Sequence, residues 1–210
     1  MAKNKVIFYY DGFNFYRGIK EVGWKNCYWL DLYKFSQRLI SKYDDYEIVA
    51  INYFTARPLD EGSRIRQGIW IKANESLHPE IEFHFGKYKP EEVICPKCSM
   101  KIQVPKEKQT DVNIAVNLMF DCMKKNCNAS FLISGDNDLL PALKCISKNY
   151  SSQKIHIAYP PKRNRSSLHE YSKFSPLHLL NSKQLFLESL LNNSYNFEDG
   201  TWAIKPIEWQ

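Results

Sequence analysis

The chain has 210 residues, of which 44% are hydrophobic and 25% charged, enough for one globular domain with a full-sized core. No segment approaches the roughly eighteen consecutive apolar residues of a membrane span. The basic N-terminus runs directly into a strand-like segment, without the longer apolar region of a signal peptide. We therefore expect a cytoplasmic protein without a membrane partner. The formal net charge of +6 weakly favours a polyanionic partner.

Hydrophobic periodicity predicts strands and helices in alternation. The expected strands are 6–10, 47–55, 80–85, 129–133 and 154–159. The expected helices begin near residues 15, 31, 63, 110, 139, 166 and 182, and the last of them runs to residue 191. Such alternation predicts an α/β fold with a mainly parallel sheet and right-handed crossovers.

The first expected strand ends at Asp11, and Asn14 follows it near the start of a helix. Asp11 either belongs to a turn or helix cap, or ligates a metal. Asn14 either caps the helix or holds a phosphate or a metal-bound water. A phosphatase-type nucleophile is disfavoured, because Phe13 occupies the position of that motif's second acid.

Three further acids stand at a helix start or a strand end. Asp111 lies at the start of a strong helix, with Thr110 or Asp111 itself expected as the N-cap. Asp136 and Asp138 follow a buried apolar strand and a Ser-Gly turn. Each acid alone is typical of a helix cap, and a first-turn acid is also favoured by the helix dipole.

Together with Asp11, these acids are expected at the carboxyl edge of the sheet, where α/β proteins bind ligands. Converging ionised carboxylates suit a hard cation such as Mg²⁺ or Mn²⁺. Such a site without another nucleophile favours metal-assisted phosphodiester hydrolysis. Asp121 lies roughly 15 Å along the helix from Asp111 and cannot share the ion.

Basic residues lie near the same predicted edge. They either hold a phosphate backbone or form solvated surface. For the arginines in and before the helix the two interpretations are evenly balanced, and for the loop phosphate binding is slightly favoured. The helical group and the residue before it are Arg57, Arg64 and Arg66, and the loop group is Lys162, Arg163 and Arg165.

The segment 87–106 differs from the rest of the chain. Two short strands flank Cys95-Pro-Lys-Cys98, which looks like half of a zinc knuckle. Structural zinc needs four ligands and no second CxxC follows, so His84 is the nearest third ligand. The alternatives are a reduced knuckle that binds nothing and a Zn²⁺ site completed by a second subunit of a homo-oligomer. The other cysteines are expected to be free thiols.

Three segments, Val6–Asn14, Lys108–Ala115 and Leu132–Leu139, resemble the NYN domain family. The resemblance also takes in Tyr53–Arg57, the cysteine knuckle and Pro160–Arg163. It implies a PIN-like, Rossmann-like three-layer sandwich related to flap-type nucleases. It also implies a Mg²⁺- or Mn²⁺-dependent ribonuclease.

Carried over by motif, the acids are Asp11, Asp111 and Asp136, with Asp138 beside them and Asn14 as a polar helper. Some relatives have an acid where this chain has Asn117, which leaves the number of metal ions open.

We expect one domain over residues 1–180, with the knuckle 87–106 inserted in it. Residues 181–210 are expected to form a helix and a tail that pack on the body or on a partner. Two functional hypotheses follow: a metal-dependent endoribonuclease, or a non-catalytic nucleic-acid-binding module that kept its acids for stability. No feature of the sequence indicates recognition of a 2′-hydroxyl, so DNA remains an alternative to RNA as partner.

Overall fold

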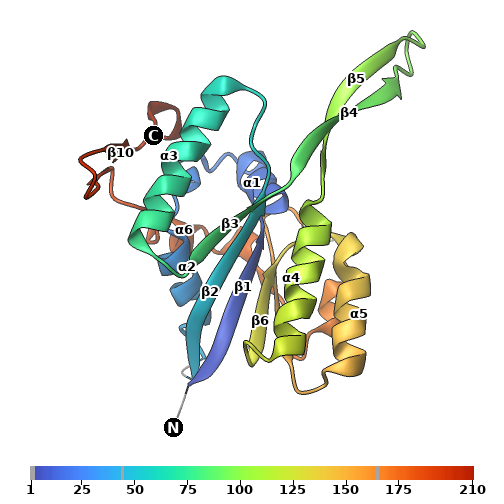
Figure 1. The fold of residues 1–210 in the computed structure, drawn as a ribbon, viewed down its shortest axis with the longest axis vertical. Coiled ribbons are helices and arrows are strands. Elements are labelled where there is room, and N and C mark those ends of the chain that lie inside the picture. Colours follow the sequence, from blue (N-terminus) through green and yellow to red (C-terminus); the bar gives the residue numbers. More distant parts are fainter. Residues whose placement is uncertain (1–2, 44, 164–165) are drawn as a thin grey trace.

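The computed structural model describes residues 3–43, 45–163 and 166–210. Its centre is a six-stranded, fully parallel sheet in the order β3-β2-β1-β6-β7-β8. Helices cover both faces, so the expected three-layer α/β/α sandwich is confirmed (Figure 1). The strands are β1 (Asn4–Asp11), β2 (Tyr46–Thr55), β3 (Ile81–Phe85), β6 (Ala129–Ile133), β7 (Lys154–Tyr159) and β8 (Leu177–His178).

Alternate residues of β1 show how the two layers form. Phe8 and Tyr10 face a core made with α1, α2, α3 and α6, whereas Ile7 and Tyr9 face a core made with α4 and α5. A central parallel strand buried on both faces explains the unbroken apolar run before Asp11. The helices are α1 (Gly12–Glu21), α2 (Leu32–Ile40), α3 (Glu61–Leu77), α4 (Thr110–Lys124), α5 (Leu140–Asn149) and α6 (Lys183–Leu187).

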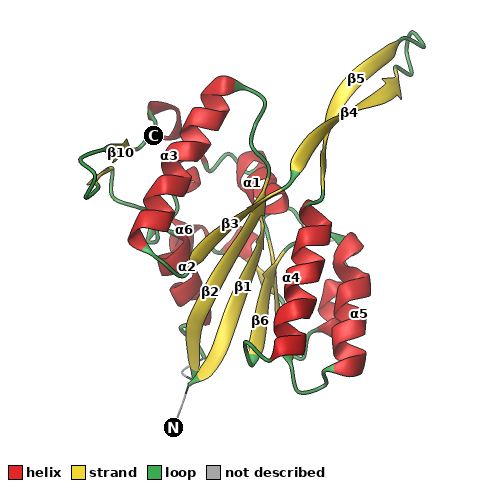
Figure 2. Cartoon of the chain, viewed as in Figure 1, coloured by secondary structure: helices red, strands yellow, loops and turns green. Residues whose placement is uncertain are grey.

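The cysteine segment forms a long antiparallel hairpin, β4 (Lys87–Ile94) and β5 (Lys101–Lys108), that projects from the body (Figure 2). It is somewhat longer than the segment 87–106 expected from the sequence. Among the described residues, no helix is both long and apolar enough to cross a membrane.

The helix expected over 182–191 is shorter than predicted. α6 ends at Leu187, and the chain then pairs with the segment before α2: Ser189 O accepts from Asp31 N at 2.9 Å, and Leu191 N donates to Trp29 O at 3.0 Å. These tertiary hydrogen bonds replace the helical ones. Phe186 is fully buried in the core. A small hairpin, β9 (Ser194–Asn196) and β10 (Trp202–Ile204), and a 3₁₀ turn, η5 (Ile207–Trp209), complete the chain.

The turn after β6 packs against the loop after β7. A Cβ placed on Gly135 would lie 2.3 Å from the carbonyl oxygen of Arg163, closer than atoms can approach. The basic loop is therefore seated directly behind the acidic turn, at the carboxyl edge of the sheet. This close approach explains why a glycine precedes Asp136.

We expect Gly135→Ala to destabilise the fold by roughly 1–3 kcal/mol, because the loop must move away from the new methyl group. Gly68→Ala, within helix α3, is the matched control, because its new Cβ would lie 4.0 Å from Arg57 Nη1, at an ordinary contact distance. It should stabilise the fold by about 0.5–1 kcal/mol through helix propensity. Urea unfolding of both variants measures the difference, and equal free energies of unfolding would contradict this packing argument.

Candidate metal centre

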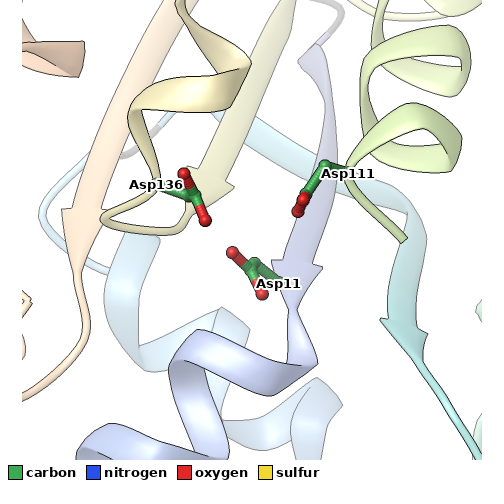
Figure 3. A group of neighbouring side chains, drawn as sticks. All are labelled: Asp11, Asp111 and Asp136. Atoms are coloured by element: carbon green, nitrogen blue, oxygen red, sulfur yellow. The ribbon is translucent and has the colours of Figure 1, made fainter. Parts of the chain in front are cut away.

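Three carboxylates meet at the carboxyl edge of the sheet, each carried by a different element. Asp11 ends β1, Asp136 follows β6, and Asp111 lies in the first turn of α4. Their ligand oxygens all lie within 4.8 Å of one another, and the side chains point toward a common centre (Figure 3). β1 and β6 are neighbours with β2 and β7 on their outer sides, so the cluster sits where the strand order reverses direction. Open α/β sheets bind their ligands at that point.

Asp11 is the most constrained member of the cluster. It is 1% exposed, and its side chain caps α1 by accepting from Asn14 N at 3.0 Å. Its second oxygen accepts from Asn14 Nδ2 at 2.7 Å and from Ser134 Oγ at 2.6 Å. The capping and metal-binding interpretations thus both suit this residue, because the cap fixes the carboxylate in place.

Ser134 is a residue whose importance the sequence reasoning missed. Its hydroxyl donates to Asp11 and accepts from the backbone N–H of Asp136 at 3.0 Å, so it links two of the acids. A serine two residues before an aspartate at a strand end signals such a turn.

The expectation that Thr110 or Asp111 caps α4 is wrong. Gln109 is the N-cap, in the left-handed region at φ 82°, and makes no side-chain capping bond. Thr110 Oγ1 instead donates to Glu107. Asp111 in the first turn is consequently available to face the other two acids, which the capping interpretation did not foresee.

The cluster carries more negative charge than its surroundings compensate. Burial raises the pKa of the Asp11 carboxyl to about 7, against hydrogen bonds from Ser134 and Asn14 that lower it. Burial also raises the pKa of Asp111 to about 6, and the charges of Asp136, Asp138 and Glu107 add to that increase. A divalent cation would remove this repulsion. Carboxylate oxygens are the ligands that Mg²⁺ and Mn²⁺ prefer, so the three side chains fit such an ion.

The other predicted acidic residues lie outside the cluster. Asp138 is exposed, and its N–H donates to Asp136 Oδ1 at 3.0 Å. Its charge reaches Asp111 but its carboxylate is not in the group of three. Asp121 accepts from Tyr9 OH at 2.7 Å and from Asn126 at 2.7 Å, which is a structural role.

The predicted cationic residues are dispersed around the site. Arg163 is close to the cluster but forms a two-pronged ion pair with Glu21 at 2.6 and 2.9 Å. Arg66 pairs with Glu208 at 2.9 Å, and Arg64 pairs with Glu61. The remaining three residues of this prediction are Arg57, stacked 4.3 Å from the Phe85 ring centre, Lys162, in a left-handed turn at φ 59°, and Arg165, which lies outside the described residues.

The expectation that His84 is the third zinc ligand is wrong. Its ring stacks on Phe54 with ring centres 4.6 Å apart and contacts Asn52 Oδ1 at 3.0 Å. Strand β4 is eight residues long, so it carries the cysteines on the order of 25 Å away from His84. At the hairpin tip, backbone N–H groups of Lys97 and Cys98 lower the pKa of the Cys95 thiol. The tip therefore favours a thiolate but offers half of a zinc ligand set.

An open cavity of about 300 Å³ lies beside the acidic cluster. Its walls come from α1, from the 3₁₀ turn η1 (Lys25–Tyr28), from α3, from the base of the hairpin and from η5. Gly12, the residue after Asp11, is part of the wall, so the cavity begins one residue from the cluster. The lining is rich in aromatic residues, which include Phe13, Tyr16, Tyr28, Tyr53, Trp70 and Trp209, and it also carries charged side chains.

The fold and the acidic cluster define a nuclease-like α/β protein, and the match to a protein family agrees with this class. The NYN domain matches residues 5–178, and the chain belongs to this family. A solved structure of a protein of unknown function, VPA0982 from Vibrio parahaemolyticus RIMD 2210633, shares the fold. Its TM-score is 0.52 at 18% identity, and the match covers 82% of this chain and 91% of that one.

A curated relative is 26% identical over 201 residues. It is 6-hydroxy-3-succinoylpyridine 3-monooxygenase HspA of Pseudomonas putida (strain DSM 28022 / S16). The match covers 80% of this chain and 63% of that enzyme, so the chain spans less than two thirds of its relative.

The raised pKa values predict how pH and metal act on stability. Between about pH 4 and pH 7 the unfolded Asp11 ionises before the folded one, so the metal-free protein should lose stability as pH rises through this range. Mn²⁺ should raise the melting temperature strongly at pH 8 and little at pH 5, where protons compete for the carboxylates. Thermal unfolding with Mn²⁺ or with EDTA at both pH values measures this.

Two variants sharpen that measurement. Asp111→Asn should reduce the stabilisation by Mn²⁺ at pH 8. Asp60→Asn should not, because Asp60 caps α3 away from the cluster and asparagine caps equally well. Equal stabilisation of both variants by Mn²⁺ would contradict a metal site at the cluster.

Proposed function

We propose that this protein is a metal-dependent ribonuclease that hydrolyses phosphodiester bonds at the cluster of Asp11, Asp111 and Asp136. The observation that supports it is the meeting of three carboxylates at the reversal point of a parallel sheet in a NYN domain. A bound Mg²⁺ or Mn²⁺ would supply an activated water and stabilise the leaving oxygen. We propose Asp138 as an auxiliary acid at the rim of this site.

The protein's own residues have definable tasks in this proposal. Asp11, held by Asn14 and Ser134, fixes the position of the site at the end of β1. Asp111 and Asp136 complete the ligand set from two other elements. Lys162 and Arg163 stand on the loop packed against the acidic turn. The charge of Lys162 suits the phosphates of the RNA chain, and Arg163 would exchange its ion pair with Glu21 for a phosphate.

Asp136→Asn should reduce metal-dependent RNA cleavage by about 100-fold or more, because it removes one charge from the group that stabilises the transition state. The fold should survive, since an asparagine can accept the same capping bond from the N–H of residue 138. The measurement uses labelled single-stranded and structured RNA with Mg²⁺, Mn²⁺ or EDTA. Asp60→Asn serves as the control variant.

The alternative, a non-catalytic RNA-binding module, makes the opposite prediction. RNA would bind without being cleaved under any metal condition, and Asp136→Asn would leave binding unchanged or tighten it by removing a negative charge. Cleavage that persists at the wild-type rate in Asp136→Asn would contradict both the proposed site and its mechanism.

The Pseudomonas relative suggests a second candidate, the oxidation of a hydroxypyridine. The aromatic cavity beside the cluster is the feature that favours it, because its volume suits one small heteroaromatic ring. Consumption of O₂ in the presence of 6-hydroxy-3-succinoylpyridine and an added two-electron reductant would support this candidate. If O₂ is not consumed and RNA is cleaved, the nuclease is supported instead.

We also propose that Cys95 and Cys98 bind zinc together with the same pair from a second copy of the chain. The projecting hairpin leaves Ile94 and Met100 more than 60% exposed beside the thiols, which suits a contact between two tips.

Metal analysis should then find one zinc for every two chains, and Cys98→Ser should abolish both the zinc and the dimer. Cys145→Ser, at a partly exposed cysteine on α5, is the control. A zinc-free monomer would contradict the proposal.

A further inference from the structure

We propose that the cavity beside the acidic cluster binds one nucleobase of the RNA strand whose phosphate lies at the cluster. This inference deepens the proposed function and rests on it. It concerns the residues that hold the substrate, which the acidic cluster does not identify.

The position of the cavity supports this inference first. Asp11 belongs to the cluster and Gly12 to the cavity wall, and consecutive Cα atoms are about 3.8 Å apart. A nucleotide whose phosphate contacts the cluster can therefore place its base in the cavity. The loop with Lys162 and Arg163 packs against the acidic turn behind Gly135, so the sugar-phosphate chain has cationic residues along the same edge.

The chemistry of the walls suits a base. Trp70 and Tyr53 form a buried floor, with their ring centres 5.1 Å apart. Phe13 and Tyr16, on the first turns of α1, are 39% and 43% exposed. Aromatic side chains of this size gain free energy when they are covered, and stacking by a base covers them without requiring a particular sequence.

Charged and polar groups also line the cavity. The Arg17 guanidinium lies 4.6 Å from the centre of the Phe13 ring, which places a positive charge beside a stacking surface. Gln67 is fixed by its Nε2, which donates to Thr55 Oγ1 and to Ala56 O, both at 3.2 Å. Because a carbonyl oxygen only accepts, this contact sets the orientation of the amide. Among the described residues, Gln67 Oε1 is buried and has no hydrogen-bond partner, so the wall holds an unpaired acceptor just beneath its surface.

The outer wall comes from the end of the chain. Trp209 contacts Tyr28 with ring centres 5.7 Å apart, and Glu208 pairs with Arg66 at 2.9 Å. This wall lies beyond residues 5–178, the part of the chain that matches the family. The cavity is therefore partly built by a segment outside the family match.

The test measures RNA binding in the Asp136→Asn background, so that it does not depend on cleavage. A short single-stranded RNA carries one abasic residue, moved stepwise along the strand. One position should lose about tenfold or more in affinity, as expected for the loss of one stacked base. Phe13→Ala and Tyr16→Ala should weaken binding of the intact RNA and remove the penalty at that position.

Phe120→Ala is the matched control. Phe120 is an exposed phenylalanine on α4, 49% exposed, with Lys124 one helical turn later, as Arg17 follows Phe13. It should keep both the affinity and the positional penalty. A uniform small effect of abasic residues, or equal behaviour of Tyr16→Ala and Phe120→Ala, would overturn the inference.

The outcomes separate this inference from the proposed function. A positional penalty without cleavage by the wild-type protein would support the base site and contradict the nuclease. Cleavage without a positional penalty would do the reverse. Binding of free 6-hydroxy-3-succinoylpyridine that depends on Tyr16, with RNA binding unaffected by Tyr16→Ala, would overturn the inference in favour of a small-molecule site.

Discussion

The repulsion among three carboxylates at one edge of the sheet is the constraint on which the rest of the site depends. A fully buried Asp11 beside Asp111 and Asp136 costs free energy that a folded protein does not bear without compensation. Part of the compensation is local: two side-chain donors and one backbone N–H hold Asp11. The pKa values of Asp11 and Asp111 stay raised, first through burial and then through the neighbouring acidic charges, so these donors offset only part of the cost.

The fold supplies the geometry that brings these acids together. β1 is the central strand, and the order of the sheet reverses between β1 and β6, so the loops after these two strands diverge to opposite faces. α4 enters the same region from the face covered by the odd-numbered residues of β1, to which Asp11 belongs. Its start at Gln109, without a capping side chain, leaves Asp111 free to face the cluster.

Much of this arrangement could be predicted from sequence. The buried run before Asp11 and the run before Asp136 identify strands by composition alone, and alternation with helices implies a parallel sheet that gathers their ends at one edge. What the sequence could not supply was three-dimensional detail. The link through Ser134 depends on a distance between two strand ends, and the exclusion of His84 depends on the length and direction of the hairpin. The cavity was not predicted, because its walls are formed by residues that are far apart in the sequence, from Phe13 to Trp209.

The most direct test of the account is to locate the metal itself. A crystal soaked in Mn²⁺ at pH 8 and measured for anomalous scattering should show a peak among the carboxylates of Asp11, Asp111 and Asp136, at coordination distance from all three. The same experiment on Asp111→Asn should show a weaker peak or none. A wild-type crystal with no peak there, or with its strongest peak at another group of acids, would contradict the account.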